Sequence, residues 1–281
     1  MSVNKIKSFA KINLALNVTG KIASLHKIES IVSFISLHDL ITIKRTSNLK
    51  HKVLFNGKFS QKIKKNNTVK KLFNILDENK LLKDKKFQVK IKKNIPQEAG
   101  LGGGSMNAAN ILRFLIKKKF IKLSQKKIKM ISNLIGSDVI LGISPKSTVL
   151  KSNNVIKKFF RSPRYYTLLV RPNFGCSTKK IYSQVKNFTT PKFKVASKHM
   201  FTTEFLKKMK NDLEIIAFKI YPKLDTLKKF LEKLSNIEFV RMTGSGSSII
   251  AYFSSGKKCK EAEKKVKKQF RNYWCKTSKT I

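Results

Sequence analysis

A glycine-rich segment is the part of the sequence with the clearest capacity for chemistry. Four glycines occur at positions 100 and 102–104, and Ser105 follows them. Residues 87–91 before it alternate like a half-buried strand, and residues 106–120 after it have the composition of an apolar helix. Glycine lets the backbone approach a ligand closely, and a helix start offers unpaired N–H groups to phosphate oxygens. The pattern predicts a phosphate-binding loop, in which Ser105 donates to a phosphate or binds Mg²⁺.

This loop differs from two widespread phosphate-binding patterns. It contains no Gly-Lys-Ser/Thr, so it is not a Walker A loop. It also lacks the G-x-G-x-x-G spacing and the ribose-binding acid of a dinucleotide fingerprint. The alternative is a flexible turn with no ligand, which four glycines at a strand-to-helix junction make less attractive.

Two charged residues, Lys11 and Asp138, form a second candidate site. Lys11 lies among apolar neighbours, and a half-buried lysine needs an anionic partner or loses its proton. Asp138 is one of only six aspartates, and its structural alternative is a turn or N-cap residue after Gly136. Together the two side chains would suit phosphoryl transfer.

Strands and helices must position these residues, and their periodicity indicates a chain of mixed α and β structure. Strands are expected over 6–18, 28–45, 52–55, 87–91, 148–150 and 166–170, and the tail 272–276 is expected to close a sheet. Residues 239–253 enclose a second turn of small residues, 243–248. Helices are expected over 67–82, 106–120, 124–134, 176–188, 200–234 and 257–270. Helix caps are expected at Thr68, Ser124 and Gly136. Turns are expected near His38–Asp39 and, as a hairpin, at Asn56–Gly57.

The charge of the chain is strongly positive. Lys plus Arg number 62 against 15 Asp plus Glu, which gives a formal net charge of +47. Such a balance favours a polyanionic partner. Only seven of these residues are arginine, however, whose planar fork suits phosphates and guanine edges better than lysine does. We therefore explain the excess of lysine by AT-rich codon usage and by lysine side chains on solvated faces. Nucleic acid is not the partner that we expect.

Other classes are excluded by composition. No apolar run approaches the roughly 18 residues of a membrane helix, and the N-terminal segment lacks a secretory cleavage site. The three cysteines include no C-x-x-C pair, so neither a disulfide framework nor a protein-bound metal site is predicted. A reducing cytoplasm fits this pattern best.

The glycine-rich segment resembles the central phosphate loop of the GHMP kinases, P-x-x-x-G-L-G-S-S-A-A. Three further segments agree with the branch whose acceptor is CDP-methylerythritol, an intermediate of non-mevalonate isoprenoid synthesis: Ala10-Lys11-Ile12-Asn13-Leu14, Gly136-Ser137-Asp138-Val139 and Met242-Thr243-Gly244-Ser245-Gly246. The motifs occur in the family's order across nearly the whole chain. The resemblance implies a two-lobed α+β fold. A lobe like domain 2 of ribosomal protein S5 is expected over 1–150, and a ferredoxin-like lobe over 151–281.

The resemblance also implies roles for individual residues. Asp138 would accept the proton of the acceptor's 2-hydroxyl, and Lys11 would hold Asp138 and the reacting oxygen while ATP, with Mg²⁺, supplies its γ-phosphoryl group. Nucleotide contacts are implied for Pro96, Gln97, Glu98, Ala99, Gly100, Leu101, Gly102, Gly103, Gly104, Ser105, Met106, Asn107 and Asn67. Contacts with the acceptor are implied for Asn13, His26, Thr178 and Tyr182, of which Tyr182 could stack on the base. Helix capping is the alternative for Asn67 and Asn107.

Several residues depart from the family pattern. Met106 replaces a serine, Leu25 stands where an aromatic residue usually lies beside the histidine, and Ile140 replaces a proline. One consequence of these departures would be weaker selectivity for the nucleotide base. Another GHMP kinase, of the homoserine or mevalonate type, and a basic nucleic-acid-binding protein remain the alternatives. The enzyme is expected to be a monomer or a homodimer.

Overall fold

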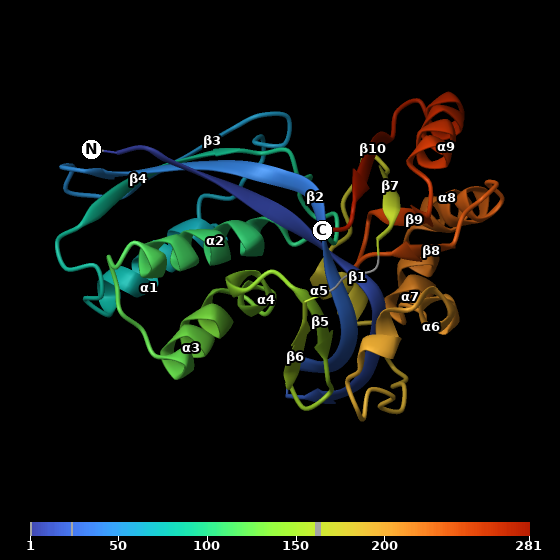
Figure 1. The fold of residues 1–281 in the computed structure, drawn as a ribbon, viewed down its shortest axis with the longest axis horizontal. Coiled ribbons are helices and arrows are strands. Elements are labelled where there is room, and N and C mark those ends of the chain that lie inside the picture. The colour runs from blue at the N-terminus through green and yellow to red at the C-terminus, as the bar shows by residue number, and fades with distance from the viewer. Residues whose placement is uncertain (1, 24, 161–163) are drawn as a thin grey trace. The chain divides into compact units, whose positions relative to one another are not determined.

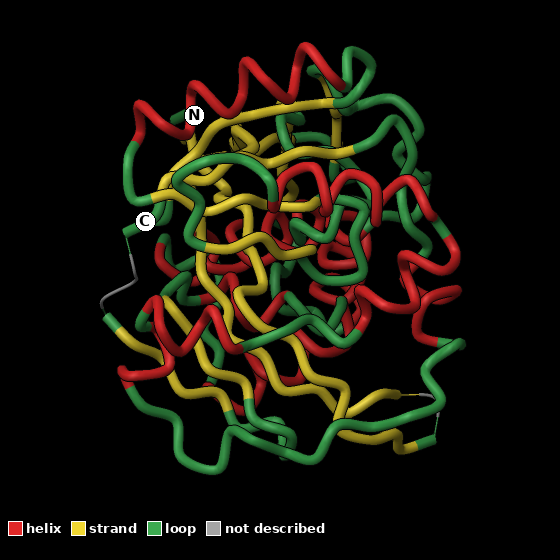
Figure 2. The backbone as a smooth tube through the Cα atoms, turned by 90° about the vertical axis from the view of Figure 1, so that its right-hand side faces the viewer, coloured by secondary structure: helices red, strands yellow, loops and turns green. Residues whose placement is uncertain are grey.

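The computed structural model describes residues 2–23, 25–160 and 164–281, which divide into two units. Unit 1 contains residues 2–10, 37–97 and 102–145. Unit 2 contains residues 11–36, 98–101 and 146–281. The strands β1 (Asn4–Ile22) and β2 (Leu25–Thr46) contribute residues to both units. Helices, strands and loops all occur along the chain, as the α+β expectation requires (Figure 2).

Unit 1 combines a sheet with a helical layer. Its β4 (Lys86–Lys92) pairs antiparallel with the second half of β2 and parallel with β3 (Lys52–Asn56). The helices of this unit are α1 (Thr68–Glu78), α2 (Gly103–Lys117), α3 (Gln125–Ile135) and α4 (Val139–Ile143). Alternate β4 residues Phe87, Val89 and Ile91 are buried among apolar residues of α1, α2 and α3. These helices therefore cover one face of the sheet, and α2 lies beside α1 (Figure 1).

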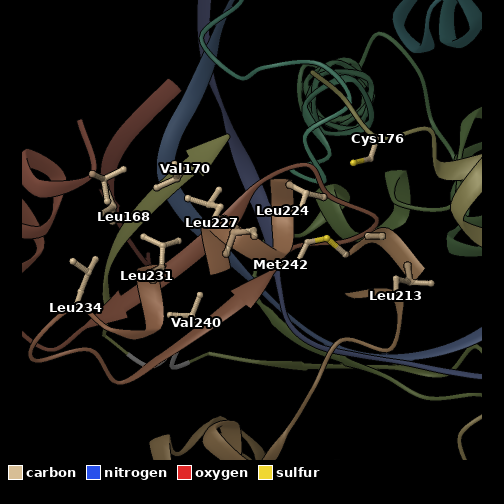
Figure 3. Packing of buried hydrophobic residues seen from close by; sticks show 14 of the residues in the cluster. Leu168, Val170, Cys176, Leu213, Leu224, Leu227, Leu231, Leu234, Val240 and Met242 are labelled. Carbon is tan, nitrogen blue, oxygen red and sulfur yellow. The ribbon is translucent and has the colours of Figure 1, made fainter. Parts of the chain in front are cut away.

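Unit 2 contains a four-stranded antiparallel sheet in the order β10-β7-β9-β8. Its strands are β7 (Tyr166–Arg171), β8 (Phe239–Met242), β9 (Ile249–Phe253) and β10 (Trp274–Lys279). Its longer helices are α7 (Leu213–Ile220), α8 (Pro222–Glu232) and α9 (Gly256–Gln269). Leucines 224, 227 and 231 of α8 pack with Leu168 and Val240 of the sheet (Figure 3). The prediction that the C-terminal tail closes a sheet is confirmed by β10.

Two predicted turns are wrong. No turn occurs at His38–Asp39, because β2 runs through it and Asp39 is fully buried with hydrogen-bond partners of its own. β3 ends at Asn56, but no hairpin follows. A hairpin turn joins two antiparallel strands, whereas β3 pairs in parallel with β4. In both cases a partner distant in sequence decides the local conformation.

Helix ends follow the sequence in most places. Ser124 and Gly136 cap α3 as predicted, and the Ser124 hydroxyl accepts the Lys127 N–H. Thr68 is not the cap of α1, because Asn67 precedes the helix and accepts two of its N–H groups. The predicted helix 176–188 is found only as α5 (Thr178–Tyr182).

Further elements of unit 2 are short. The first half of β2 pairs with β5 (Ser147–Leu150), and β5 pairs with β6 (Ile156–Phe159). The strand β6 was not predicted from the sequence. The predicted helical region 200–234 begins in a 3₁₀ helix, Lys198–Phe201, and continues through α6 (Thr203–Lys208), α7 and α8. Of the residues described, none belongs to a helix long and apolar enough to cross a membrane.

The three cysteines are free thiols, and we expect them to be unreactive in the native protein. Burial raises the pKa of Cys176 and Cys259 to about 12 and, with the Glu263 carboxylate, that of Cys275 to about 11. At pH 8 each thiolate fraction falls about 100- to 1,000-fold below that of an ordinary thiol. A chromogenic disulfide reagent should titrate all three only after denaturation. Rapid titration of three thiols in the native state would contradict this.

Candidate functional site

The second half of the glycine-rich segment forms the start of α2. Gly102 has a φ of +66° and precedes the helix, and no side chain caps the helix start. Gly104 is exposed and Ser105 is half-buried, so the first amides of α2 are close to solvent. The first N–H groups of a helix lack partners within the helix, and they carry its partial positive charge. This end of α2 can therefore bind an anion, as the sequence predicts.

The first half of the segment, residues 98–101, packs within unit 2 against the turn 243–248. The N–H groups of Ser247 and Ser248 donate to the carbonyls of Glu98 and Ala99, at 3.2 and 3.4 Å. The Thr243 hydroxyl donates to the Gly100 carbonyl at 3.1 Å. The sequence left two roles open for this turn, phosphate contact or packing against the loop. The structure shows packing, and it uses the amides of these two serines.

Three other loop residues have structural partners. Gln97 donates its amide to the carbonyls of Phe59 and Gln61, at 3.1 and 2.7 Å. Pro96 is buried beside it. Met106 is fully buried and faces Gly142, where an added Cβ would lie 3.0 Å from the Met106 sulfur. The Met106 side chain thus fills the core of unit 1, and only its backbone could contact a nucleotide.

Lys11 and Asn13 lie on one face of β1, two residues apart. Lys11 is 5% exposed, and its Nζ donates to the Asn13 Oδ1 at 2.7 Å. The Asn13 Nδ2 donates to the Ser30 hydroxyl at 2.8 Å, and its backbone N–H donates to Thr243 Oγ1 at 3.0 Å. The structure therefore brings a predicted catalytic residue and a predicted acceptor-binding residue into one buried polar network of unit 2.

Asp138 lies in unit 1 at the start of α4 and is half-buried. Its side chain makes no capping hydrogen bond to that helix. Asp138 therefore occupies the turn and N-cap position named as its structural alternative, but its side chain does not cap the helix. Lys11 belongs to unit 2 and Asp138 to unit 1, so the interaction between their side chains stays a prediction.

Two aromatic rings lie beside the predicted acceptor-binding histidine in unit 2. The His26 ring centroid lies 5.0 Å from that of Tyr182 and 6.5 Å from that of Phe188. Burial, followed by the charge of Lys21, lowers the pKa of His26, so the neutral imidazole predominates at pH 7. Leu25 is 75% exposed and adds no ring. Sequence reasoning missed Phe188, whose only signal is an aromatic residue within a polar stretch.

The remaining predicted contact residues are Thr178, Asn67 and Asn107. Thr178 is exposed and shares a 2.9 Å hydrogen bond with Ser245. Asn67 caps α1, accepting the N–H groups of residues 69 and 70 at 3.1 and 3.2 Å, which is the structural alternative named for it. Asn107 is 1% exposed and caps nothing; its Oδ1 has no hydrogen-bond partner among the described residues. That oxygen could accept a hydrogen bond from a ligand.

Two protein-family models match separate parts of the chain. The GHMP kinases N terminal domain matches residues 67–144, and the GHMP kinases C terminal domain matches residues 195–272. A 4-diphosphocytidyl-2-C-methyl-D-erythritol kinase of Pelagibacter ubique is 54% identical over 281 residues, all of both chains. The chain belongs to the GHMP kinases, in the 4-diphosphocytidyl-2-C-methyl-D-erythritol kinase family. An enzyme of the same description from Ehrlichia canis is 31% identical over 90% of each chain.

Solved structures agree with the GHMP kinase fold. A crystal structure of 4-(cytidine 5'-diphospho)-2C-methyl-D-erythritol kinase matches with a TM-score of 0.78 at 20% identity, covering 98% of this chain and 99% of the other. A homoserine kinase from Cytophaga hutchinsonii matches with a TM-score of 0.68 at 14% identity, covering 100% and 97%. The predicted fold class is confirmed, and this GHMP kinase is an ATP-dependent small-molecule kinase rather than the nucleic-acid-binding alternative.

Proposed function

We propose that this GHMP kinase transfers the γ-phosphoryl group of ATP to the 2-hydroxyl of 4-diphosphocytidyl-2-C-methyl-D-erythritol. One observation carries the proposal: the Pelagibacter relative named for that acceptor is 54% identical over every residue of both chains. The start of α2 supports the nucleotide half, because its glycines and unpaired amides suit a triphosphate.

In this proposal the loop contributes mainly through position and fixed charge. The amides at the start of α2 and the Ser105 hydroxyl bind phosphate oxygens, and so they align the γ-phosphoryl group for in-line transfer. Within the described residues, no three His, Cys, Asp or Glu side chains form a metal site. Mg²⁺ binds mainly through substrate phosphates and waters and needs few protein ligands. Bound there, Mg²⁺ would neutralise charge on the phosphates.

Lys11 and Asp138 would act on the acceptor alcohol. The Asp138 carboxylate takes the proton of the 2-hydroxyl as the bond to phosphorus forms, which contributes about 10²- to 10⁴-fold to the rate. The Lys11 ammonium stabilises the developing negative charge on that oxygen. Its hydrogen bond to Asn13 supports this role, because it holds a buried cation in a fixed direction.

The ring cluster of unit 2 would bind the cytidine end. A neutral His26 offers one donor and one acceptor nitrogen to the edge of a cytosine. Tyr182, 5.0 Å away, offers a face on which the base can stack. We also propose a cytoplasmic location, which the three free thiols support.

An ADP-release assay against a panel of acceptors tests the function. The panel contains 4-diphosphocytidyl-2-C-methyl-D-erythritol, homoserine and mevalonate, each with ATP and Mg²⁺. ADP release that depends on the cytidine-linked alcohol alone is expected, with a product phosphorylated at its 2-hydroxyl. Turnover of homoserine or mevalonate with none of the cytidine compound would overturn the acceptor assignment.

Replacing His26 by alanine is expected to raise KM for the acceptor about tenfold, the cost of one or two lost contacts, and to leave KM for ATP unchanged. Burial lowers the pKa of His26 from the ordinary value of 6.5, so the neutral imidazole predominates at pH 7 and above, and the acceptor KM of the unaltered enzyme should rise as the pH falls and the ring is protonated. Initial rates measured over a range of concentrations of both substrates give the two KM values. His199→Ala is the control, since His199 is exposed and contacts Phe205 alone among the described rings. Equal acceptor KM values for the two variants would contradict the role.

A further inference from the structure

Asp39 is a fully buried carboxylate in the middle of a strand. Its exposed fraction is 0%, and β2 continues on both sides of it. Ionised side chains in a protein interior require paired charges and hydrogen bonds, because they lose their hydration on folding. The partners of Asp39 therefore indicate what the residue is for, and the proposed reaction does not use it directly.

All four hydrogen bonds that Asp39 accepts come from residues of unit 1 near the glycine-rich loop. Its Oδ1 accepts the backbone N–H groups of Asn94 and Ile95, at 2.8 and 2.9 Å. Its Oδ2 accepts hydrogen bonds from the Asn107 Nδ2 at 2.9 Å and from the Lys93 Nζ. Lys93 is 4% exposed, so this is a buried ion pair.

These donors flank the loop in sequence. Residues 93–95 come immediately before Pro96, and Asn107 lies five residues after Gly102, which precedes α2. One carboxylate thus joins the chain entering the loop to the helix leaving it. A side chain that bridges both ends of a loop limits how the segment between them can move.

The contacts of Gly103 show that the start of α2 packs directly on this cluster. A Cβ at Gly103 would lie 3.0 Å from the Ile95 Cγ2 and 3.2 Å from the Lys93 Nζ. The first helical residue therefore rests against two of the residues that Asp39 holds. A change in the direction of Lys93 or Ile95 would shift the amides at the start of α2.

We propose that Asp39 is a positioning residue for ATP binding, which acts by fixing both ends of the phosphate loop. It touches neither ATP nor the reacting atoms. It holds Lys93, the backbone of residues 94–95 and Asn107, so that the amides at the start of α2 are already aligned before the triphosphate arrives. Preorganised donors bind more tightly because the ligand does not have to order them. The inference rests on the proposed use of this loop for ATP.

The test replaces Asp39 by asparagine, which keeps its size. An asparagine oxygen can still accept from the backbone, but its NH₂ then faces the donors of Lys93 and Asn107. Losing hydrogen bonds between charged groups is expected to raise the ATP dissociation constant about 10- to 100-fold. We expect kcat at saturating ATP to stay within about threefold, and the acceptor KM to be unchanged. Calorimetric titration with ATP alone and two-substrate kinetics measure these values.

Asp77→Asn is the matched control. Asp77 lies in α1 of the same unit, and its carboxylate pairs with Lys86 at 3.0 Å and with the His51 ring at 3.3 Å. Its loss should lower thermal stability while ATP affinity stays unchanged. If Asp39→Asn does not fold, D39N/K93M removes the unpaired ammonium and should restore folding, with ATP affinity still reduced.

The outcomes separate this inference from the proposed function. An ATP dissociation constant for folded D39N or D39N/K93M within twofold of the unaltered enzyme overturns the positioning role. A fall in kcat with unchanged ATP affinity also overturns it. Because the ATP titration contains no acceptor, a wrong acceptor assignment leaves its result intact. Failure of the unaltered enzyme to bind ATP would reject both.

Discussion

Replacing Asp138 by asparagine is expected to lower kcat about 10²- to 10⁴-fold, because an amide cannot accept the proton of the acceptor alcohol. ATP affinity should stay within about twofold of the unaltered enzyme. The fold should be preserved, since the Asp138 side chain does not cap α4 and only its charge is removed. Single-turnover phosphoryl transfer measures the chemical step, and calorimetry with ATP measures binding.

Asp225→Asn provides a control for loss of a carboxylate elsewhere. Asp225 forms an exposed ion pair with Lys229, one turn along α8, at 2.7 Å. Solvent and salt screen an exposed pair of this kind, so it contributes little, and both kcat and stability should stay close to those of the unaltered enzyme. A kcat for Asp138→Asn as high as that of this control would reject Asp138 as the proton acceptor.

Replacing Gly100 by alanine is expected to destabilise the protein by about 3–5 kcal/mol, the range of the most damaging single substitutions. Gly100 has a φ of +73°, and a Cβ there would lie 1.9 Å from the carbonyl oxygen of Thr243. Alanine in this conformation costs about 1–2 kcal/mol, and the clash would also force residues 98–101 away from the turn 243–248. Urea unfolding measures the free energy, and ADP release should fall with the folded fraction.

Gly20→Ala serves as the comparison. A Cβ at Gly20 would lie 3.6 Å from the Lys27 Cδ, which is an ordinary contact, and Gly20 does not need a positive φ. Its effect should stay within about 1 kcal/mol. Equal unfolding free energies for the two alanine variants would contradict the close packing of the two glycine-rich turns.

Predictions from the sequence succeeded where neighbouring residues decide the conformation. Ser124 and Gly136 delimit α3 because a hydroxyl cap and a glycine act within one helical turn. The glycines before Ser105 likewise predicted a loop and a helix start, and α2 begins at Gly103. Alternation over residues 87–91 predicted β4, since strand periodicity is visible in five residues.

Predictions failed where a polar group finds its partner elsewhere in the chain. Asp39 predicted a turn, because aspartate is disfavoured in strands, but donors 54 and 68 residues away make its burial acceptable. The turn at Asn56–Gly57 predicted a hairpin, but β3 pairs in parallel with residues 88–92 of β4, where Lys52 lies opposite Gln88. The ring of Phe188 had no local signal, and its contact with His26 joins residues 162 positions apart.

The sequence by itself therefore determined the family, the glycine-rich loop before α2 and the residue types available for catalysis, because these depend on short ordered motifs. Only the tertiary structure decided that residues 98–101 pack against the turn 243–248, that Lys11 donates to Asn13, and that Asp39 ties the loop to α2. The physical reason is that a buried polar side chain must be hydrogen-bonded, while the position of its partner depends on how distant segments pack.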